Sequence, residues 1–417
     1  MRVVGLVIVV CASAACGGEV QPVTDGEPFV VRDSSGVRIS ESRDSAWTSE
    51  TAQRLSGTPA LEIGTLSGPD PATTFTFVRD VVRFPDGRTA VLDFLTREIR
   101  VFGRDGQHVL TFGREGDGPG EFRGPVRMSV VRGDSVVVWD LDGRRISVFS
   151  DRGSFGRSFA FSFLDWNGLF GAGVPGWFPD ASFVVTHTVS GDDLPQSIGI
   201  AMAQWHLAGA DGEHVRQLTT LPARYGRSLA SVGGYQVNGR TRFSPEPSSG
   251  LDSTGLWHAF PLTYELRHVT REGRLDRIVR RAWQPKPLPD EVRASYREWY
   301  EREGESPRAP RARVQAELRQ LTFMDTLPAF STFLVTTDGR LWVRAYLEPE
   351  NLGPDNWGGT GTNEWSVFDR DGRWLGTVVT PSGFRVHEVG ADYVLGVWTD
   401  EFDVQYVRVY ELSADTF

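Results

Sequence analysis

Apolar positions along this chain gather into short runs separated by polar turns, and one kind of run recurs six times. Each copy carries aliphatic or aromatic residues near its end, and a tight turn containing glycine follows five of the six. The copies lie at 99–102, 146–149, 204–207, 265–269, 366–368 and 406–410. Self-similarity at regular spacing is typical of folds built from copies of one supersecondary unit.

A second run precedes each copy and follows a polar turn, such as Asp86-Gly87-Arg88 or Asp338-Gly339. Short β-rich runs bounded by turn residues indicate antiparallel sheet. We expect first strands at 81–84 and 128–131, and fourth strands at 108–112, 277–280 and 374–379. The pattern therefore predicts an all-β fold over residues 29–417, a six-bladed β-propeller with four-stranded antiparallel blades.

The two ends of the repeat array indicate how the ring closes. The last blade lacks a fourth strand, whereas residues 59–64 resemble the strand at 110–113. We expect this N-terminal strand to complete the last blade, because closure removes an exposed sheet edge. Residues 29–40, which turn at Ser34-Ser35-Gly36, predict an extra hairpin or edge strand.

One interval between the repeated glycines, from Gly273 to Gly372, is too long for a single blade. The excess is a polar stretch at about 289–322 with apolar residues at helical spacing. Pro307 and Pro310 separate its two halves. The sequence predicts a helical hairpin inserted between blades four and five.

The N-terminus has Arg2, an apolar run over 3–10 and small residues up to Cys16, which together predict a signal peptide at 1–15. The segment resembles a bacterial lipoprotein signal, although Ser13 stands where such motifs usually have leucine. The resemblance implies lipidation of Cys16, a tether at 16–28 and a cell-envelope location facing the periplasm or exterior. Gly17, which is not aspartate, favours the outer membrane. The alternative is a plain secretory signal.

Composition narrows the function. The net charge of -10 and the pI near 5.3 argue against a nucleic-acid partner, because the basic residues are interleaved with acids. Lys286 is the only lysine, which disfavours Schiff-base chemistry. Both cysteines lie at the N-terminus, so the body of the chain has no disulfide and no thiolate metal ligand.

A family resemblance follows from blades one and two. Residues 116–122, the strand that ends in Trp139-Asp140, and residues 144–149 resemble an NHL-type repeat. More broadly, residues 29–417 resemble the six-bladed propeller lipoproteins of several bacterial groups. The resemblance implies this fold and ligand binding on one rim, and it carries no shared chemistry.

Four polar residues are candidates at the mouth of the channel. Asp93 and Asp140 end second strands at equivalent positions, so their expected role is turn capping. His187 occupies the corresponding place in blade three, and the three could instead converge as metal ligands or acid/base groups. Asp400 lies in an acidic cluster that is either solvated or binds Ca²⁺. No other cofactor and no defined metal site is predicted.

Loop aromatics and two arginines are the candidates for a ligand-binding rim. Aromatic side chains on a rigid scaffold make good binding anchors, and the alternative is a small core under the inserted helices. Arg127 and Arg385 begin first strands, which line the channel, so they face an anionic ligand or pair with acids such as Asp80. The aromatic candidates are Trp166, Trp177, Trp299 and Trp357.

These observations favour a membrane-anchored, non-catalytic propeller that binds a protein, peptide or glycan on the rim bearing the insertion. The sequence has no Gly-x-Ser-x-Gly and no His-Glu-x-x-His motif. The alternative is a propeller enzyme of the lactonase, lyase or hydrolase type, with a metal or a His/Asp/Arg set at the central channel. A purely structural envelope role comes third.

Overall fold

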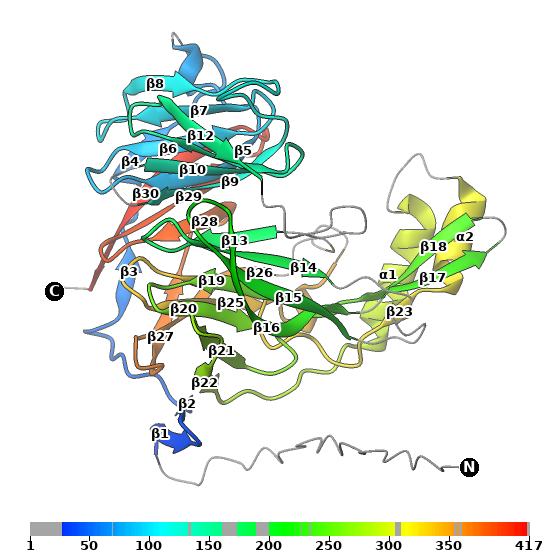
Figure 1. The fold of residues 1–417 in the computed structure, drawn as a ribbon. Helices are drawn as coiled ribbons and strands as arrows, with labels where there is room; N and C mark the ends of the chain where they lie inside the picture. Colours follow the sequence, from blue (N-terminus) through cyan, green and yellow to red (C-terminus); the bar gives the residue numbers. More distant parts are fainter. Residues whose placement is uncertain are drawn as a thin grey trace, which may run out of the picture.

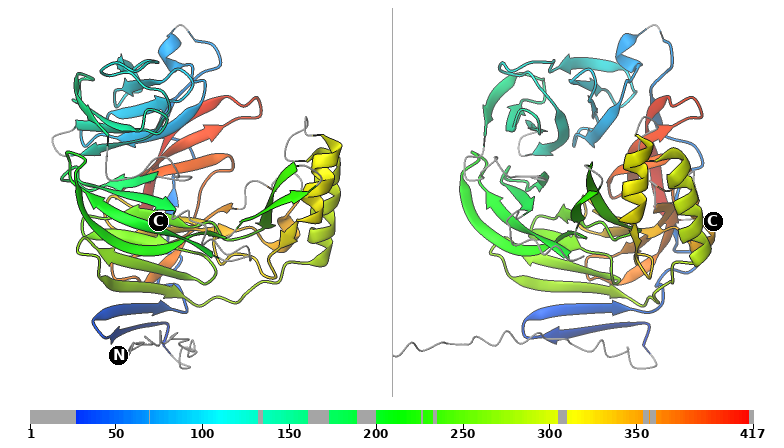
Figure 2. Two further views of the ribbon diagram at one scale, coloured as in Figure 1. Left: turned by 45° about the vertical axis from the view of Figure 1, so that its right-hand side comes forward. Right: turned by 90° about the vertical axis from the view of Figure 1, so that its right-hand side faces the viewer.

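The computed structural model describes residues 27–414 except 69, 132–134, 161–172, 189–199, 226, 233–234, 305–309, 354–356 and 358–360. Its strands form a six-bladed β-propeller, with the blades fanned around a central axis (Figures 1 and 2). The predicted fold class is confirmed.

Each of the first five blades is a four-stranded antiparallel sheet whose first strand is innermost. Blade 1 is β5 (Val78–Arg83), β6 (Thr89–Asp93), β7 (Glu98–Phe102) and β8 (His108–Phe112). Blade 2 is β9 (Pro125–Val131), β10 (Ser135–Asp140), β11 (Arg145–Phe149) and β12 (Phe155–Phe159). Blade 3 is β13 (Gly173–Trp177), β14 (Phe183–Thr188), β15 (Ile200–Ala208) and β16 (His214–Tyr225).

Blades 4 and 5 repeat this order, and blade 6 borrows its outer strands. Blade 4 is β19 (Ser248–Leu251), β20 (Gly255–Ala259), β21 (Glu265–Thr270) and β22 (Leu275–Arg281). Blade 5 is β24 (Thr332–Val335), β25 (Leu341–Tyr346), β26 (Gly361–Phe368) and β27 (Trp374–Val379). Blade 6 is β28 (Phe384–Val389), β29 (Tyr393–Thr399) and β30 (Gln405–Ala414), joined by β3 (Gln53–Leu55) and β4 (Leu61–Ile63).

The ring closes as the sequence predicts. Strand β4 pairs antiparallel with β30, with Ile63 opposite Val407, and β3 extends the same edge, with Leu55 opposite Leu412. The segment near the N-terminus therefore supplies the fourth strand of the last blade. Its backbone groups occupy an edge that would otherwise be open to other chains.

The core consists of the interfaces between blades. Because each blade is covered on both faces, alternate residues of a second strand pack on opposite neighbours: Val91 faces blade 6, whereas Ala90 and Leu92 face blade 2. Among the described residues, six apolar clusters lie between successive blades and a seventh lies in the insertion. This double burial explains why the second strands are continuous apolar runs.

The predicted extra hairpin extends blade 4. Strands β1 (Phe29–Ser34) and β2 (Val37–Ser42) are joined by a two-residue turn with φ of 55° at Ser35 and 82° at Gly36. Positive φ at both positions is the type I′ geometry that suits a two-residue hairpin. Strand β2 pairs parallel with β22, so the sheet of blade 4 has six strands.

The predicted helical hairpin is present between blades 4 and 5. Helices α1 (Asp290–Glu303) and α2 (Arg311–Arg319) protrude from one end of the ring (Figure 2). They pack with a strand pair from the preceding connection, β17 (Arg227–Val232) and β18 (Tyr235–Arg242), and with β23 (Thr322–Phe323). The sequence did not reveal that two separate connections build the insertion.

The two ends of the ring differ. We call the end formed by the first-to-second-strand turns, such as 85–88 and 338–339, the turn face. The end that carries the insertion is the loop face (Figure 1). The turn face includes short Asp-Gly turns, whereas the insertion extends from the loop face.

Candidate functional site

The first strand of every blade has a free inner edge whose backbone groups face the channel. On blades 6, 1 and 2, a side chain of one first strand bonds the backbone of the next. Arg385 Nη2 donates to Val78 O at 2.7 Å, and Arg127 Nη1 donates to Pro175 O at 2.6 Å. Asp80 Oδ2 accepts from Met128 N at 2.8 Å. These bonds hold neighbouring blades together from inside the channel.

A three-residue network crosses the gap between blades 6 and 1. His387 Nδ1 lies 3.1 Å from Asp80 Oδ1, and Arg385 Nε donates to His387 Nε2 at 3.0 Å. Because Nε of arginine always carries a hydrogen, His387 Nε2 is the acceptor and Nδ1 carries the proton given to Asp80. These two hydrogen bonds thus fix one neutral tautomer of His387.

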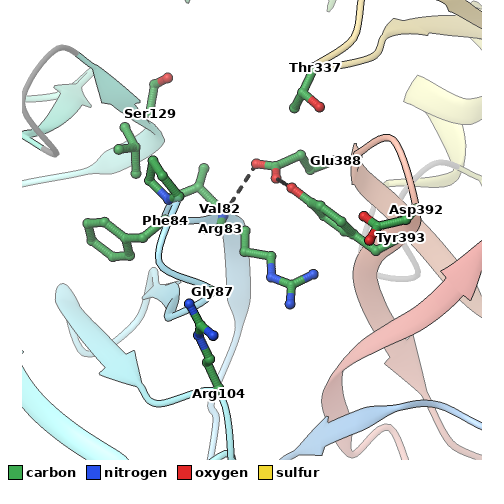
Figure 3. Close-up of a pocket in the computed structure, with 12 residues that line it drawn as sticks. Val82, Arg83, Phe84, Gly87, Arg104, Ser129, Thr337, Glu388, Asp392 and Tyr393 are labelled. Carbon is green, nitrogen blue, oxygen red and sulfur yellow. Dashed lines mark hydrogen bonds between the residues drawn. The ribbon is translucent and has the colours of Figure 1, made fainter.

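A second polar group lies nearer the turn face (Figure 3). The Tyr393 hydroxyl donates to Glu388 Oε1, and the backbone N–H of Arg83 donates to Glu388 Oε2 at 3.3 Å. The Arg83 guanidinium lies 4.3 Å from the centre of the Tyr393 ring, a cation–π contact. Burial raises the pKa of Glu388, so this carboxyl holds its proton more tightly than an exposed one. Burial and the adjacent Glu388 also raise the pKa of Tyr393.

Two adjoining cavities open at this end of the channel. The first, of about 570 Å³, is lined by Arg83, Ser129, Glu388 and Tyr393. The second, of about 1070 Å³, extends over blades 2 to 5. They share Pro85, Val130 and Thr337, and we call them together the turn-face mouth. The first cavity is within the range of small-molecule sites, about 300–1,000 Å³, and the second is near its upper end.

The two cavities differ in lining. The second has apolar walls from Trp177, Phe178, Leu251 and Val335, with polar groups at its rim. At that rim, Arg271 Nη2 donates to Asp180 Oδ2 at 2.7 Å. Although burial raises the pKa of Asp180, bonds from Ser182 and Arg271 lower it to about 2. The mouth thus combines one polar compartment with one in which apolar walls and charged side chains lie side by side.

Asp93 and Asp140 lie at the loop face and cap the chain that enters their blades. Both are fully buried. Asp93 accepts from the backbone N–H of Thr76 and Phe77, and Asp140 accepts from that of Gly124 at 2.7 Å. Each serves its own blade, so the structure does not bring the two carboxylates together.

His187 and Asp400 also lie apart from one another. The His187 ring stacks on His206 with 5.2 Å between ring centres, and burial lowers the pKa of His187. Asp400 Oδ1 accepts from Phe402 N and Val404 N at 2.9 Å, which closes the turn between β29 and β30. In the described part of the chain, no three His, Cys, Asp or Glu side chains are placed to hold a metal ion.

The aromatic candidates fall into three environments. Trp166 lies outside the described residues. Trp177 is buried between blades 2 and 3 and reaches the wall of the turn-face mouth. Trp299 and Trp357 pack half-buried in the insertion, with 6.5 Å between their ring centres and Tyr296 beside both. Their use as binding anchors remains a prediction.

Apart from Trp177, the residues at the turn-face mouth were not among the sequence candidates. Glu388 lies at a β-bulge: Val386 pairs with Gly396 and Glu388 with Leu395, which leaves His387 as the extra residue. Strand β5 has a similar bulge, with Arg79 as the extra residue. Bulges redirect side chains and are frequent beside functional sites. The polar run Arg385-Val386-His387-Glu388 inside an otherwise apolar strand was the available clue.

No family model and no curated protein matches this chain. Among solved structures, it is similar to a protein described as exported from Bacteroides fragilis, with 12% identity, a TM-score of 0.48, and coverage of 91% of this chain and 100% of that one. A DUF4221 member from Bacteroides vulgatus has 10% identity, a TM-score of 0.47 and coverage of 88% and 100%. Virginiamycin B lyase from Staphylococcus aureus has 9% identity, a TM-score of 0.40 and coverage of 87% and 99%.

No helix among the described residues is long and apolar enough to cross a bilayer.

Proposed function

We propose that this protein is a lipid-anchored, non-catalytic propeller of the cell envelope that binds a small polar ligand in the turn-face mouth. The anchor would be Cys16 and the tether residues 16–28, as the N-terminal sequence predicts. The outer membrane is the expected site, since Gly17 follows Cys16. Palmitate labelling tests the anchor: labelling is expected in the wild type and absent in Cys16→Ser.

The observation that carries the binding proposal is the cavity that joins Glu388, Tyr393 and Arg83 at the turn-face mouth. Within the described residues, the Arg83 guanidinium has no hydrogen-bonding partner and only stacks on Tyr393. A guanidinium without a carboxylate partner that faces a cavity is available for ligand recognition. The second compartment beside it offers room for the rest of the molecule.

The insertion rim, with Trp299, Trp357 and Trp166, was the expected docking surface for a protein, peptide or glycan. The packing of Trp299 and Trp357 against Tyr296 supports a scaffolding role for these two side chains. A ligand lost on trimming residues 289–322, yet retained on blocking the mouth, would move the site back to this rim.

The test is a thermal-shift screen of saccharides, amino acids, dipeptides and organic acids against the purified protein. Hits should raise the melting temperature of the wild type and not of Thr337→Trp, which fills the place where the two cavities meet. Val109→Trp introduces the same side chain at an exposed position on blade 1, and the same ligands should still raise its melting temperature. Hits that survive Thr337→Trp would refute binding in the mouth.

The second candidate is an enzyme, and the raised pKa of Glu388 favours it. A buried carboxyl whose pKa lies above its ordinary value is better suited to act as a general acid. Turnover of a lactone or lyase substrate that disappears in Glu388→Gln, while ligand binding persists, would establish catalysis. Binding without turnover for every hit would support the non-catalytic proposal.

A further inference from the structure

Three arginines follow one another on the first strands of blades 6, 1 and 2, toward the loop-face end of the channel. They are Arg385 on β28, Arg79 on β5 and Arg127 on β9, and all three are exposed. First strands line the lumen, so solvent reaches these side chains through the channel. Arg79 is the extra residue of the bulge in β5, where it pairs with no residue of β6.

None of the three arginines has a carboxylate partner within the described ranges. The sequence left open whether Arg127 and Arg385 pair with Asp80 or face a ligand. Asp80 instead accepts a hydrogen bond from His387 Nδ1 at 3.1 Å. Arg88, by contrast, is paired with both Asp86 and Asp151. The charge of the three channel arginines is therefore not neutralised by an ion pair within these ranges.

Two of the three guanidinium groups are held in place while keeping free donors. Arg385 uses Nε on His387 and one Nη2 hydrogen on Val78 O, and Arg127 uses one Nη1 hydrogen on Pro175 O. A guanidinium has five N–H donors, so each retains hydrogens for a ligand. Arg79 makes no hydrogen bond to another described residue, which leaves all five of its donors available.

The local charge is unbalanced. Arg79, Arg127 and Arg385 bring three positive charges, and Asp80 brings one negative charge whose oxygens already accept from Val81 N, Met128 N and His387. Burial in the channel and repulsion from Arg79 lower the pKa of Arg385. Arg79 and Arg385 are like charges on neighbouring strands, so a counter-charge near them is favourable.

We infer that the loop-face end of the channel binds a small oxyanion, a phosphate, sulfate or carboxylate group, through Arg79, Arg127 and Arg385. Oxyanions match the paired N–H donors of guanidinium groups. The site draws on the starts of first strands, whereas the turn-face mouth draws on their ends, so the inference does not rest on the proposed function.

Calorimetric titration of inorganic phosphate into the purified protein at low ionic strength tests the site. Saturable binding is expected, and Arg79→Gln should weaken it at least about tenfold, because charge-assisted hydrogen bonds of this kind contribute about 1.5–3 kcal/mol. Arg79 has no partner in the described structure, so this variant should fold normally. Arg152→Gln removes an exposed arginine from the turn between β11 and β12 and should bind as the wild type does.

Three results would overturn the inference: no saturable binding of phosphate, sulfate or citrate, undiminished binding by Arg79→Gln, or an equal loss in Arg152→Gln, which would indicate a general charge effect. Thr337→Trp separates the two sites. Phosphate binding should persist in Thr337→Trp, although hits at the turn-face mouth should be lost.

Discussion

The channel wall has two unlike halves. The first strands of blades 6, 1 and 2 carry charged side chains, among them Arg385, Asp80 and Arg127. The first strands of blades 3, 4 and 5 have the sequences GVPGW, SSGL and TFLV, without a charged residue. Both halves must join neighbouring blades along free inner edges, and they do so by different means.

On the uncharged half, Gly250 lets the first strands of blades 4 and 5 approach closely. A Cβ at Gly250 would lie 2.7 Å from Val335 Cγ2, whereas one at Gly176 would make an ordinary contact with Leu251 at 3.4 Å. On the charged half, hydrogen bonds from Arg385 and Asp80 span the gap between neighbouring first strands. The second solution leaves donors, acceptors and titratable groups in the lumen, and both the oxyanion site and the polar compartment of the turn-face mouth draw on these blades.

Removal of Asp80 should have the largest effect on stability. Asp80 accepts from Val81 N, Met128 N and His387, so Asp80→Ala leaves donors of three blades without their acceptor. Hydrogen bonds to a charged group contribute about 1.5–3 kcal/mol, and we expect a loss of about 3 kcal/mol in the free energy of unfolding, measured in urea. Asp80→Asn keeps one acceptor and should lose less; equal losses would mean that these bonds contribute little.

A bulky residue at Gly250 tests the other half. Gly250→Val places its side chain against Val335, and overpacking of this kind costs about 1–3 kcal/mol. We expect about 2 kcal/mol by the same urea measurement. Gly57→Val is the control, because a Cβ at Gly57 meets nothing within 4 Å. If the two variants lose the same stability, close approach is not what joins blades 4 and 5.

Protonation of Glu388 gives the charged half of the channel wall a pH dependence. Burial raises the pKa of Glu388 in the folded state above its value in the unfolded chain, about 4.3. Its contribution to stability is therefore complete below that value and is lost as pH rises through the folded pKa, by about 1.4 kcal/mol for each unit of difference. Unfolding measured across pH should show the wild type losing stability relative to Glu388→Gln toward alkaline pH; parallel curves would contradict this.

The blades were predictable because their determinants are local. Continuous apolar second strands and turns with glycine at positive φ, such as Gly106 and Gly372, recur in the sequence itself. The closing strand was also visible, because 59–64 resembles another fourth strand. The β17–β18 pair was missed because no local feature tells that the connection before blade 4 packs on helices α1 and α2 some 50 residues later.

The turn-face mouth was not predictable because its contacts join distant residues. Arg83 and Glu388 are 305 positions apart, and Asp80 and His387 are 307 apart. Only the curvature of the ring brings blades 6 and 1 together. Arg127 and Arg385 could be placed on the channel from their position in the repeat. That neither of them pairs with a carboxylate of a described residue could be learned only from the structure.

The smallest expected effect on stability concerns two arginines of the turn face, and it tests whether the difference between the two halves of the channel wall extends beyond the lumen. Arg104 in blade 1 and Arg370 in blade 5 make the same bond, each donating through Nε to the carbonyl of an aspartate in the first-to-second-strand turn, Asp86 or Asp338. Because this bond lies on the turn face and not in the lumen, Arg104→Ala and Arg370→Ala should each cost about 0.5–1 kcal/mol, with no difference between halves. Paired urea unfolding curves measure this. A clearly larger loss at Arg104 would mean that the asymmetry of the channel wall continues outward into the turns, so that the two halves differ as whole blades and not only along their inner edges.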